Sequence, residues 1–169
     1  MGATDPAADV VRLRAPRERV SPRARWMWVA GDLLRTAVVM TVLLLVVGPW
    51  DWFDLPAWVI WAVAGVQLAY AAVVPQWRYL VHRWEVTDTA VYTQTGWWAR
   101  ERRIAPMSRV QTVDHQEGAI SRLFGLATVR VTTASSAGAL TIEGLDRDRA
   151  LAIVDGLTRT ADSVPGDAT

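Results

Sequence analysis

Residues 33–74 read LLRTAVVMTVLLLVVGPWDWFDLPAWVIWAVAGVQLAYAAVV, two apolar runs with a short aromatic and acidic break between them. The first run covers residues 33–47 and the second covers residues 56–74. Because a helix rises about 1.5 Å per residue, roughly 20 residues cross a hydrocarbon layer of about 30 Å. The second run has that length, and further apolar residues precede the first. We therefore predict a transmembrane helical hairpin over residues 26–77.

The break at residues 49–54, PWDWFD, combines a helix breaker, two acids and three aromatic side chains, which is typical of a turn at a membrane interface. The ten tryptophans lie mostly at the ends of the apolar runs, where indole rings favour the headgroup region. A buried hairpin in a soluble protein is the alternative, but soluble helices show a polar face, and Gln67 is the one strongly polar residue of residues 56–74. A signal peptide is disfavoured because the first run starts deep in the chain and a second follows it.

Arginines are distributed unevenly around the predicted hairpin. Six lie within residues 1–25, Arg78 and Arg83 follow the second run, and the break has no basic residue. Since basic loops stay in the cytoplasm, both termini are expected on the cytoplasmic side. Residues 1–25 have no apolar periodicity, so they are expected to form a disordered tail. Asp32 and Arg35, three residues apart at the start of the first span, are expected to form an ion pair.

After residue 77 the chain consists of short segments rich in β-branched and aromatic residues, with turn residues between them. About seven short strands are expected, including residues 79–86, 90–95, 97–104, 109–114, 127–133 and 140–143. A final helix follows, with Asp146 as its N-cap and an apolar stripe of Ala150, Leu151, Val154 and Leu157. This pattern predicts an antiparallel barrel or sandwich capped by a C-terminal helix. Residues 161–169 are expected to be a second disordered tail.

The sequence offers little support for catalytic or metal chemistry. It has no cysteine, which excludes disulfides, thiol nucleophiles and cysteine-based metal sites. Asp114, His115 and Glu117 lie close together, but His82 is the one other histidine, so solvated polar residues at a strand end are the preferred interpretation. The serines at 135–136 lack the Gly-x-Ser-x-Gly context of a hydrolase. We predict no enzyme activity, no metal and no cofactor, and a net charge of +1 gives no indication of nucleic-acid binding.

Arg100, Arg102 and Arg103 form the strongest polar cluster of the predicted domain. On an alternating strand Arg100 and Arg102 share one face, and Glu101 and Arg103 share the other. Beside a bilayer, such a cluster binds anionic headgroups at roughly 1 kcal/mol per arginine. The alternative is a solvated strand face whose charge is partly neutralised by Glu101.

Residues 104–113, IAPMSRVQTV, and residues 120–129, ISRLFGLATV, resemble characteristic elements of the YdbS-like family of bacterial PH-like membrane proteins. Residues 142–145, IEGL, followed by a short helix, resemble a third element, and the resemblance covers about residues 26–160. We expect Arg122 to hold a loop through backbone carbonyls, Leu123 and Phe124 to plug the barrel, and Gly125 to adopt a conformation that a side chain disfavours. The positions that carry the two main motifs are Arg109, Gln111, Arg122, Leu123, Phe124, Gly125 and Leu126.

The resemblance implies an integral protein of the bacterial inner membrane. It also implies a cytoplasmic PH-like domain over residues 78–160, a bent barrel of seven strands plugged by a C-terminal helix, and no enzyme activity. Some members resemble partners of a larger membrane protein with repeated PH-like domains, and relatives are linked to membrane stress. Many eukaryotic PH domains bind phosphoinositides through basic residues between their first two strands. Here that turn is the acidic Thr87-Asp88-Thr89, so a phosphoinositide pocket is not expected.

Three functions remain open. The preferred one is a non-catalytic module for protein interaction or complex assembly. The second is a membrane sensor that binds anionic lipids through Arg100, Arg102 and Arg103. A transporter subunit that uses Asp32, Arg35 and Gln67 is the third, and it would need oligomerisation because two spans cannot enclose a pathway.

Overall fold

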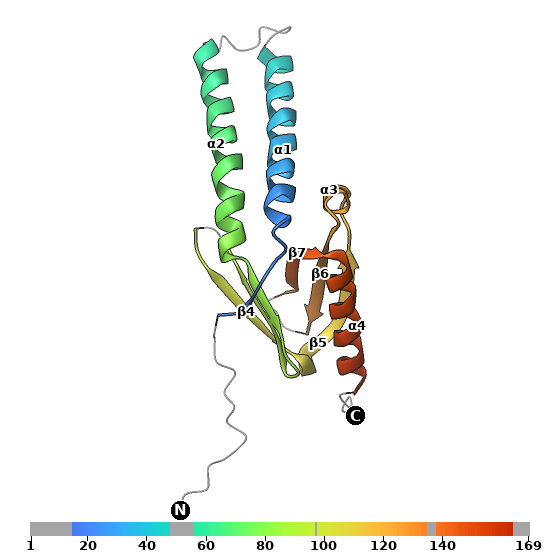
Figure 1. Cartoon of the computed structure of the whole chain (residues 1–169). Helices are drawn as coiled ribbons and strands as arrows, with labels where there is room; N and C mark the ends of the chain where they lie inside the picture. Colours follow the sequence, from blue (N-terminus) through green and yellow to red (C-terminus); the bar gives the residue numbers. More distant parts are fainter. Residues whose placement is uncertain (1–14, 48–55, 97, 135–137, 164–169) are drawn as a thin grey trace, which may run out of the picture.

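The computed structural model describes residues 15–47, 56–96, 98–134 and 138–163, and Figure 1 shows a helical hairpin that stands on a mainly β domain. The hairpin consists of α1 (Ala24–Val47) and α2 (Ala57–Val81). Both helices are long and apolar enough to cross a membrane. Their outward side chains include Trp61 and Val66, which are 76% and 71% exposed within the molecule, and apolar residues on outer faces suit a lipid environment. The predicted turn at residues 49–54 lies outside the described residues.

Contacts between the helices set the register of the hairpin. The Arg35 guanidinium lies 4.9 Å from the centre of the Tyr70 ring, and the Arg78 guanidinium lies 4.4 Å from the centre of the Trp28 ring. Because the helices are antiparallel, positions midway between these contacts, Gly31 and Val74, are level along the hairpin. The predicted ion pair of Asp32 and Arg35 is confirmed at 3.1 Å.

The described strands form two antiparallel sheets. The first has the order β1-β2-β3-β4, and the second has the order β5-β6-β7. A short 3-10 turn, η1 (Met107–Arg109), joins the sheets, and α3 (Ala119–Leu123) joins β5 to β6. The arrangement is PH-like, as predicted, although hydrogen bonds among the described strands leave two open sheets where a single barrel was expected. The strands are β1 (Glu18–Arg19), β2 (Arg83–Val86), β3 (Ala90–Thr95), β4 (Glu101–Pro106), β5 (Val110–Gln116), β6 (Leu126–Thr133) and β7 (Leu140–Asp146).

The C-terminal helix α4 (Arg147–Ser163) covers the core between the sheets. It begins directly after Asp146, where the sequence predicts its start, and Ala150 and Leu157 are at most 1% exposed. Leu151, predicted in the same stripe, is 43% exposed instead. Its place is taken by Ile153, because successive residues turn about 100° around a helix and the apolar seam follows a spacing of three and four.

The N-terminal segment differs from the prediction of a disordered tail up to residue 25. Pro16 and Val20 are buried, and β1 pairs antiparallel with β2. Ser21 is held twice by β7, since its backbone N–H donates to the Gly144 carbonyl at 2.8 Å and its hydroxyl donates to Asp146 at 2.9 Å. These partners lie more than 60 residues away in sequence, so no local pattern indicated them.

Several element boundaries also differ. The strand predicted at residues 97–104 is β4 at Glu101–Pro106, and the strand predicted at residues 140–143 extends to Asp146. The helix α4 continues to Ser163, into the predicted C-terminal tail.

The strand predicted from residue 79 starts at Arg83, because α2 continues to Val81 and ends with the His82 N–H donating to the Arg78 carbonyl at 2.8 Å. The loop predicted at residues 118–125 contains α3. Aromatic and β-branched residues suit a buried helix end as well as a strand, so packing decided where α2 ends and β2 begins.

Candidate functional site

A groove with a volume of about 410 Å³ lies where the end of α2 meets the first sheet. We call it the arginine groove, because three arginines from β2, β4 and the connection before β4 line it. The described residues around it include no acidic side chain. It is lined by Ala15, Trp77, Leu80, Val81, Arg83, Gln94, Arg100 and Arg102.

Strand register explains why Arg83 and Arg102 meet. Arg83 of β2 lies opposite Gln94 of β3, and Gln94 lies opposite Arg102 of β4. Residues directly opposite each other share a sheet face, so the three side chains form a row across the sheet. Gln94 is 4% exposed and is fixed on both sides, since its Nε2 donates to the Val81 carbonyl at 3.0 Å and its Oε1 accepts from Arg102 Nε at 2.9 Å. The end of α2 therefore positions Arg102.

The structure divides the predicted arginine cluster between two faces. Arg100 and Arg102 line the arginine groove, whereas Arg103 lies opposite Thr93 and its Nε donates to Glu101 at 2.6 Å. The alternation predicted from the sequence agrees with this division. Arg83 and Trp77 were not predicted as part of the same site, because their proximity to Arg102 depends on strand register.

A second hollow, the junction pocket, lies between α2 and both sheets, and Arg103 lines it. Its other cation, Arg78, forms an ion pair with Glu143 at 2.6 Å. Glu101 balances Arg103 in the same way, so the charges of this pocket cancel. The junction pocket is thus a poorer site for an anion than the arginine groove.

His82 also lines the junction pocket and is 4% exposed. Burial, with a smaller contribution from the Arg78 charge, lowers the pKa of His82 to about 4, so the ring is neutral at pH 7. Its ring packs on Trp28 with centroids 5.5 Å apart. Neither ring nitrogen has a hydrogen-bond partner among the described residues.

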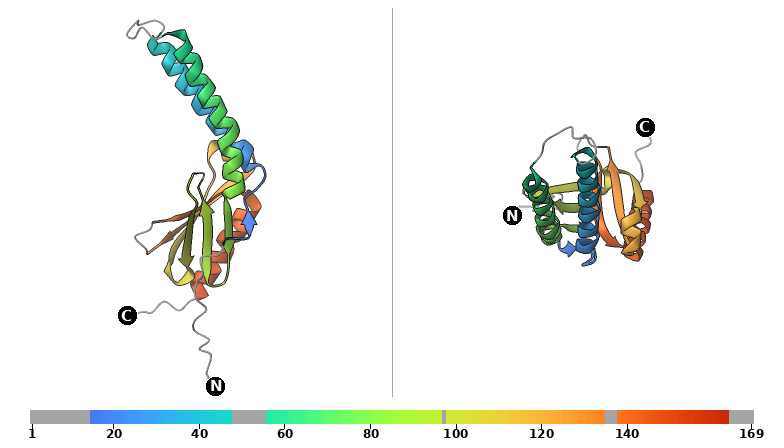
Figure 2. Two further views of the ribbon diagram at one scale, coloured as in Figure 1. Left: turned by 90° about the vertical axis from the view of Figure 1, so that its left-hand side faces the viewer. Right: turned by 90° about the horizontal axis from the view of Figure 1, so that it is seen from above.

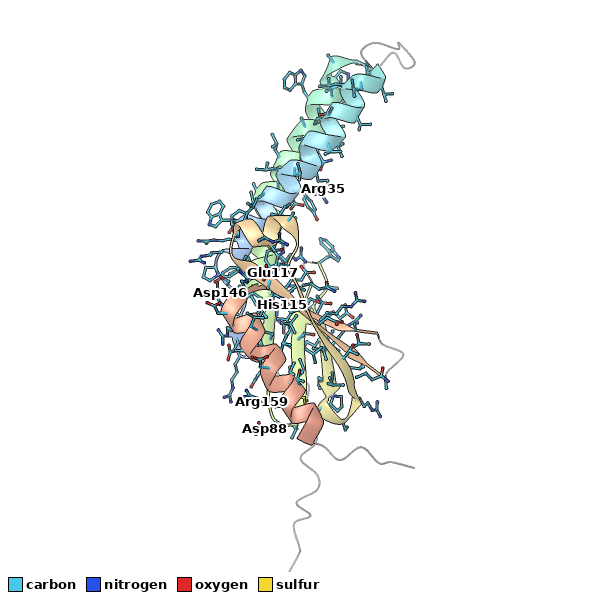
Figure 3. All side chains as sticks on the ribbon, turned by 90° about the vertical axis from the view of Figure 1, so that its right-hand side faces the viewer. Arg35, Asp88, His115, Glu117, Asp146 and Arg159 are labelled. Carbon is cyan, nitrogen blue, oxygen red and sulfur yellow. The ribbon has the colours of Figure 1, made fainter. Side chains whose placement is uncertain are left out.

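The acidic and histidine residues near the end of β5 form an ion network. Glu117 accepts from Arg147 Nε at 2.7 Å, and its carboxylate lies 3.6 Å from His115 Nε2 and 3.9 Å from Arg122 Nε. Within the described ranges, no group of three or more His, Asp or Glu side chains is arranged to hold a metal ion. Figure 3 shows His115 and Glu117 near the hairpin end of the domain, and Asp88 at its far end.

Comparison with known proteins identifies the family. A family model described as "Bacterial PH domain" matches residues 27–161, which cover nearly all of the hairpin and the strands β2–β7. The chain belongs to the bacterial PH domain family. A curated relative, the UPF0699 transmembrane protein YdbS of Bacillus subtilis (strain 168), is 27% identical over 152 residues, which are 86% of this chain and 93% of the relative. No solved structure matched the chain.

These matches confirm the resemblance predicted from the sequence motifs. With the two apolar helices, they show that this chain is a membrane protein that carries a bacterial PH domain. The acidic turn around Asp88 lies at the end of the bacterial PH domain that is remote from the hairpin (Figure 3). A headgroup site at this turn would be unable to reach the membrane in which the hairpin lies.

The second motif of the bacterial PH domain behaves partly as predicted. Leu126 is 1% exposed in the core, and Gly125 has a φ of +65°, the left-handed conformation that glycine tolerates best. Phe124 is half-buried against the core. The prediction that Leu123 plugs the barrel is wrong, because α3 turns this side chain outward and leaves it 84% exposed.

The remaining motif positions lie at the surface. The Arg122 side chain is 72% exposed, and it lies 3.9 Å from the Glu117 carboxylate, whereas contacts with backbone carbonyls were expected. Arg109 ends η1, and its carbonyl accepts from the Ala134 N–H at 3.0 Å. Gln111 is exposed at a register shift between β5 and β6. Both residues lie where the backbone bends, so a role in backbone geometry accounts for Arg109 and Gln111 in the motif better than contact with a ligand does.

Proposed function

We propose that this bacterial PH domain is a non-catalytic module that binds anionic lipid headgroups on the cytoplasmic side of the membrane spanned by its own hairpin. The observation that carries the proposal is the arginine groove, in which Arg83, Arg100 and Arg102 lie beside Trp77 without an acidic residue among the described lining. Arginine forks bind phosphate through paired N–H donors, and indole rings favour the headgroup region.

The position of the groove along the hairpin supports this function. The apolar part of α2, residues 57–74, is roughly 18 residues long and rises about 27 Å, close to the hydrocarbon thickness of about 30 Å. Trp77 follows about 4.5 Å further along the same helix. With the hydrocarbon boundary near Val74, the groove lies at the depth of the lipid phosphates. Arginines lie before the first helix of the hairpin and after the second, whereas the break between the helices has no basic residue. This distribution supports a cytoplasmic location for the domain.

Three arginines at about 1 kcal/mol each would favour an anionic over a zwitterionic lipid by roughly 3 kcal/mol, or about 100-fold. The test uses the full-length protein in detergent, with phosphatidylglycerol and phosphatidylcholine added in equal amounts and bound lipid counted by native mass spectrometry. The Arg83→Gln/Arg100→Gln/Arg102→Gln variant should lose most of the preference for phosphatidylglycerol.

Arg103→Gln is the matched control, because Arg103 lies on the same strand but faces the junction pocket and pairs with Glu101. This variant should keep the preference of the unchanged protein. Raised salt should weaken binding in the unchanged protein and have little effect on the triple variant. Equal binding of both lipids by the unchanged protein, or an unaltered preference in the triple variant, would contradict the proposal.

A second candidate function is the assembly of a complex with another membrane protein, such as a larger protein with repeated PH-like domains. The specific observation is that Gly65, Ala69 and Ala72 lie on an exposed face of α2, and no described atom lies within 4 Å of a Cβ added at Gly65. Small residues on an outer face let a second transmembrane helix approach closely. A photo-cross-linker at position 66, within native membranes, should capture a reproducible partner, and cross-links to lipid alone would exclude this use of the face.

A further inference from the structure

Two apolar side chains of the domain are exposed more than any other large hydrophobic residue in the described part of the chain. Trp98 is 88% exposed and Leu123 is 84% exposed. Trp98 lies in the connection between β3 and β4, and Leu123 ends α3. Exposed apolar side chains that join a larger apolar surface commonly mark contact with a partner or a membrane.

Both residues lie at the same height along the hairpin. Trp98 shares an apolar groove with Val73, Val74 and Trp77 of α2. On the other helix, Ile120 of α3 approaches to 3.8 Å from a Cβ added at Gly31. Since Gly31 and Val74 are level, α3 and the β3–β4 connection both reach the end of the apolar part of the hairpin.

Trp98 and Leu123 each lie at a tip of the domain, the first in the β3–β4 connection and the second at the end of α3. These two tips lie on opposite sides of the hairpin. In Figures 1 and 2, α3 is beside α1, and the β3–β4 connection is beside α2. The hairpin therefore lies between the two tips, at the level where its apolar part begins. Two contacts on opposite sides of a membrane anchor would limit the tilt of the attached domain.

An arginine lies close in sequence to the apolar residue of each tip. Arg100 follows Trp98 by two residues and lines the arginine groove. Arg122 precedes Leu123, and its side chain is 72% exposed. An apolar side chain flanked by arginine suits the boundary between hydrocarbon and headgroups, where the ring or aliphatic chain inserts and the guanidinium meets phosphate.

We propose that Trp98 and Leu123 are docking tips that insert into the interfacial layer of the bilayer spanned by the hairpin, and so hold the domain in one orientation against the membrane. The bilayer is the occupant that fits, because the surface of Trp98 is continuous with the apolar face of α2. Insertion of apolar side chains does not require anionic lipid, so this inference is independent of headgroup binding in the arginine groove.

The absence of cysteine allows a direct test by site-directed spin labelling of the full-length protein in lipid nanodiscs. Single substitutions Trp98→Cys and Leu123→Cys would carry a nitroxide, and its collisions with oxygen and with a water-soluble nickel chelate would report depth. Asp88→Cys and Arg159→Cys are the controls, since both positions lie at the far end of the domain (Figure 3).

We expect labels at positions 98 and 123 to collide several-fold more with oxygen, relative to nickel, than the control labels do. This result should hold in neutral and in anionic nanodiscs, which separates it from the charge dependence expected for the arginine groove. Nickel accessibility at either tip equal to that of the controls would overturn the inference. Protection of a tip from both reagents would also overturn it, because this outcome indicates a protein contact.

Discussion

Gly144 lies where the start of α1 crosses β7, and replacing it with alanine tests how the hairpin is joined to the domain. Gly144 has a φ of +74°, and a Cβ added there would lie 2.5 Å from the Ala24 Cβ. The Gly144 carbonyl also accepts the Ser21 N–H at 2.8 Å, directly before α1 begins. Gly144→Ala therefore combines backbone strain with a clash against a residue that is 0% exposed.

The expected loss of stability in Gly144→Ala has two parts, one from backbone strain and one from the clash. A side chain in the left-handed region costs about 1–2 kcal/mol, and overpacking a closed site costs about 1–3 kcal/mol. We expect Gly144→Ala to lower the free energy of unfolding by about 2–5 kcal/mol. Gly138→Ala is the matched control, because Gly138 has a φ of +79° but no described atom within 4 Å of an added Cβ. It should show the strain alone, about 1–2 kcal/mol.

The assay is thermal and urea unfolding of the full-length protein in detergent, followed by near-UV circular dichroism. Adding Ala24→Gly to Gly144→Ala removes the methyl group that causes the clash, so the double variant should be more stable than the sum of the single changes predicts by about 1–3 kcal/mol. Equal losses at Gly144 and Gly138, or strict additivity in the double variant, would refute the packing argument.

Three further predictions concern buried and paired groups. Because the pKa of His82 falls from 6.5 in the unfolded chain to about 4 in the folded state, the unfolded chain binds the proton first. Stability should therefore be unaffected above pH 6.5 and decrease by up to about 3 kcal/mol as the pH falls to 4, and unfolding of His82→Leu across this range should lose that slope. Glu117→Gln, which weakens the 2.7 Å pair with Arg147, should cost about 1 kcal/mol in urea unfolding, and high salt should reduce this difference. Leu145→Ala, at 1% exposure, should cost about 2–5 kcal/mol, whereas Leu151→Ala, at 43% exposure, should cost less than about 1 kcal/mol in the same measurement.

The candidate site was only partly predictable. The alternation of side chains along a strand was enough to separate Arg100 and Arg102 from Arg103, and the structure has the same separation. The sequence did not indicate that Arg83 completes the groove, because that depends on which residue of β3 lies opposite it. Leu123 was expected in the core, since an apolar residue within a family motif usually packs inside, and the short helix α3 turns it outward instead.

Features that depend on residues close together in the chain were predictable from the sequence. Length and apolar composition predict the two helices, the three-residue spacing predicts the Asp32–Arg35 pair, and the motifs identify the family. Tertiary structure alone decided that β1 joins β2, that Arg83 and Arg102 share one groove, and that Trp98 and Leu123 reach the same height on the hairpin. The physical reason is that periodicity reports which side of an element a residue occupies, whereas the identity of its partner depends on packing between segments far apart in the chain.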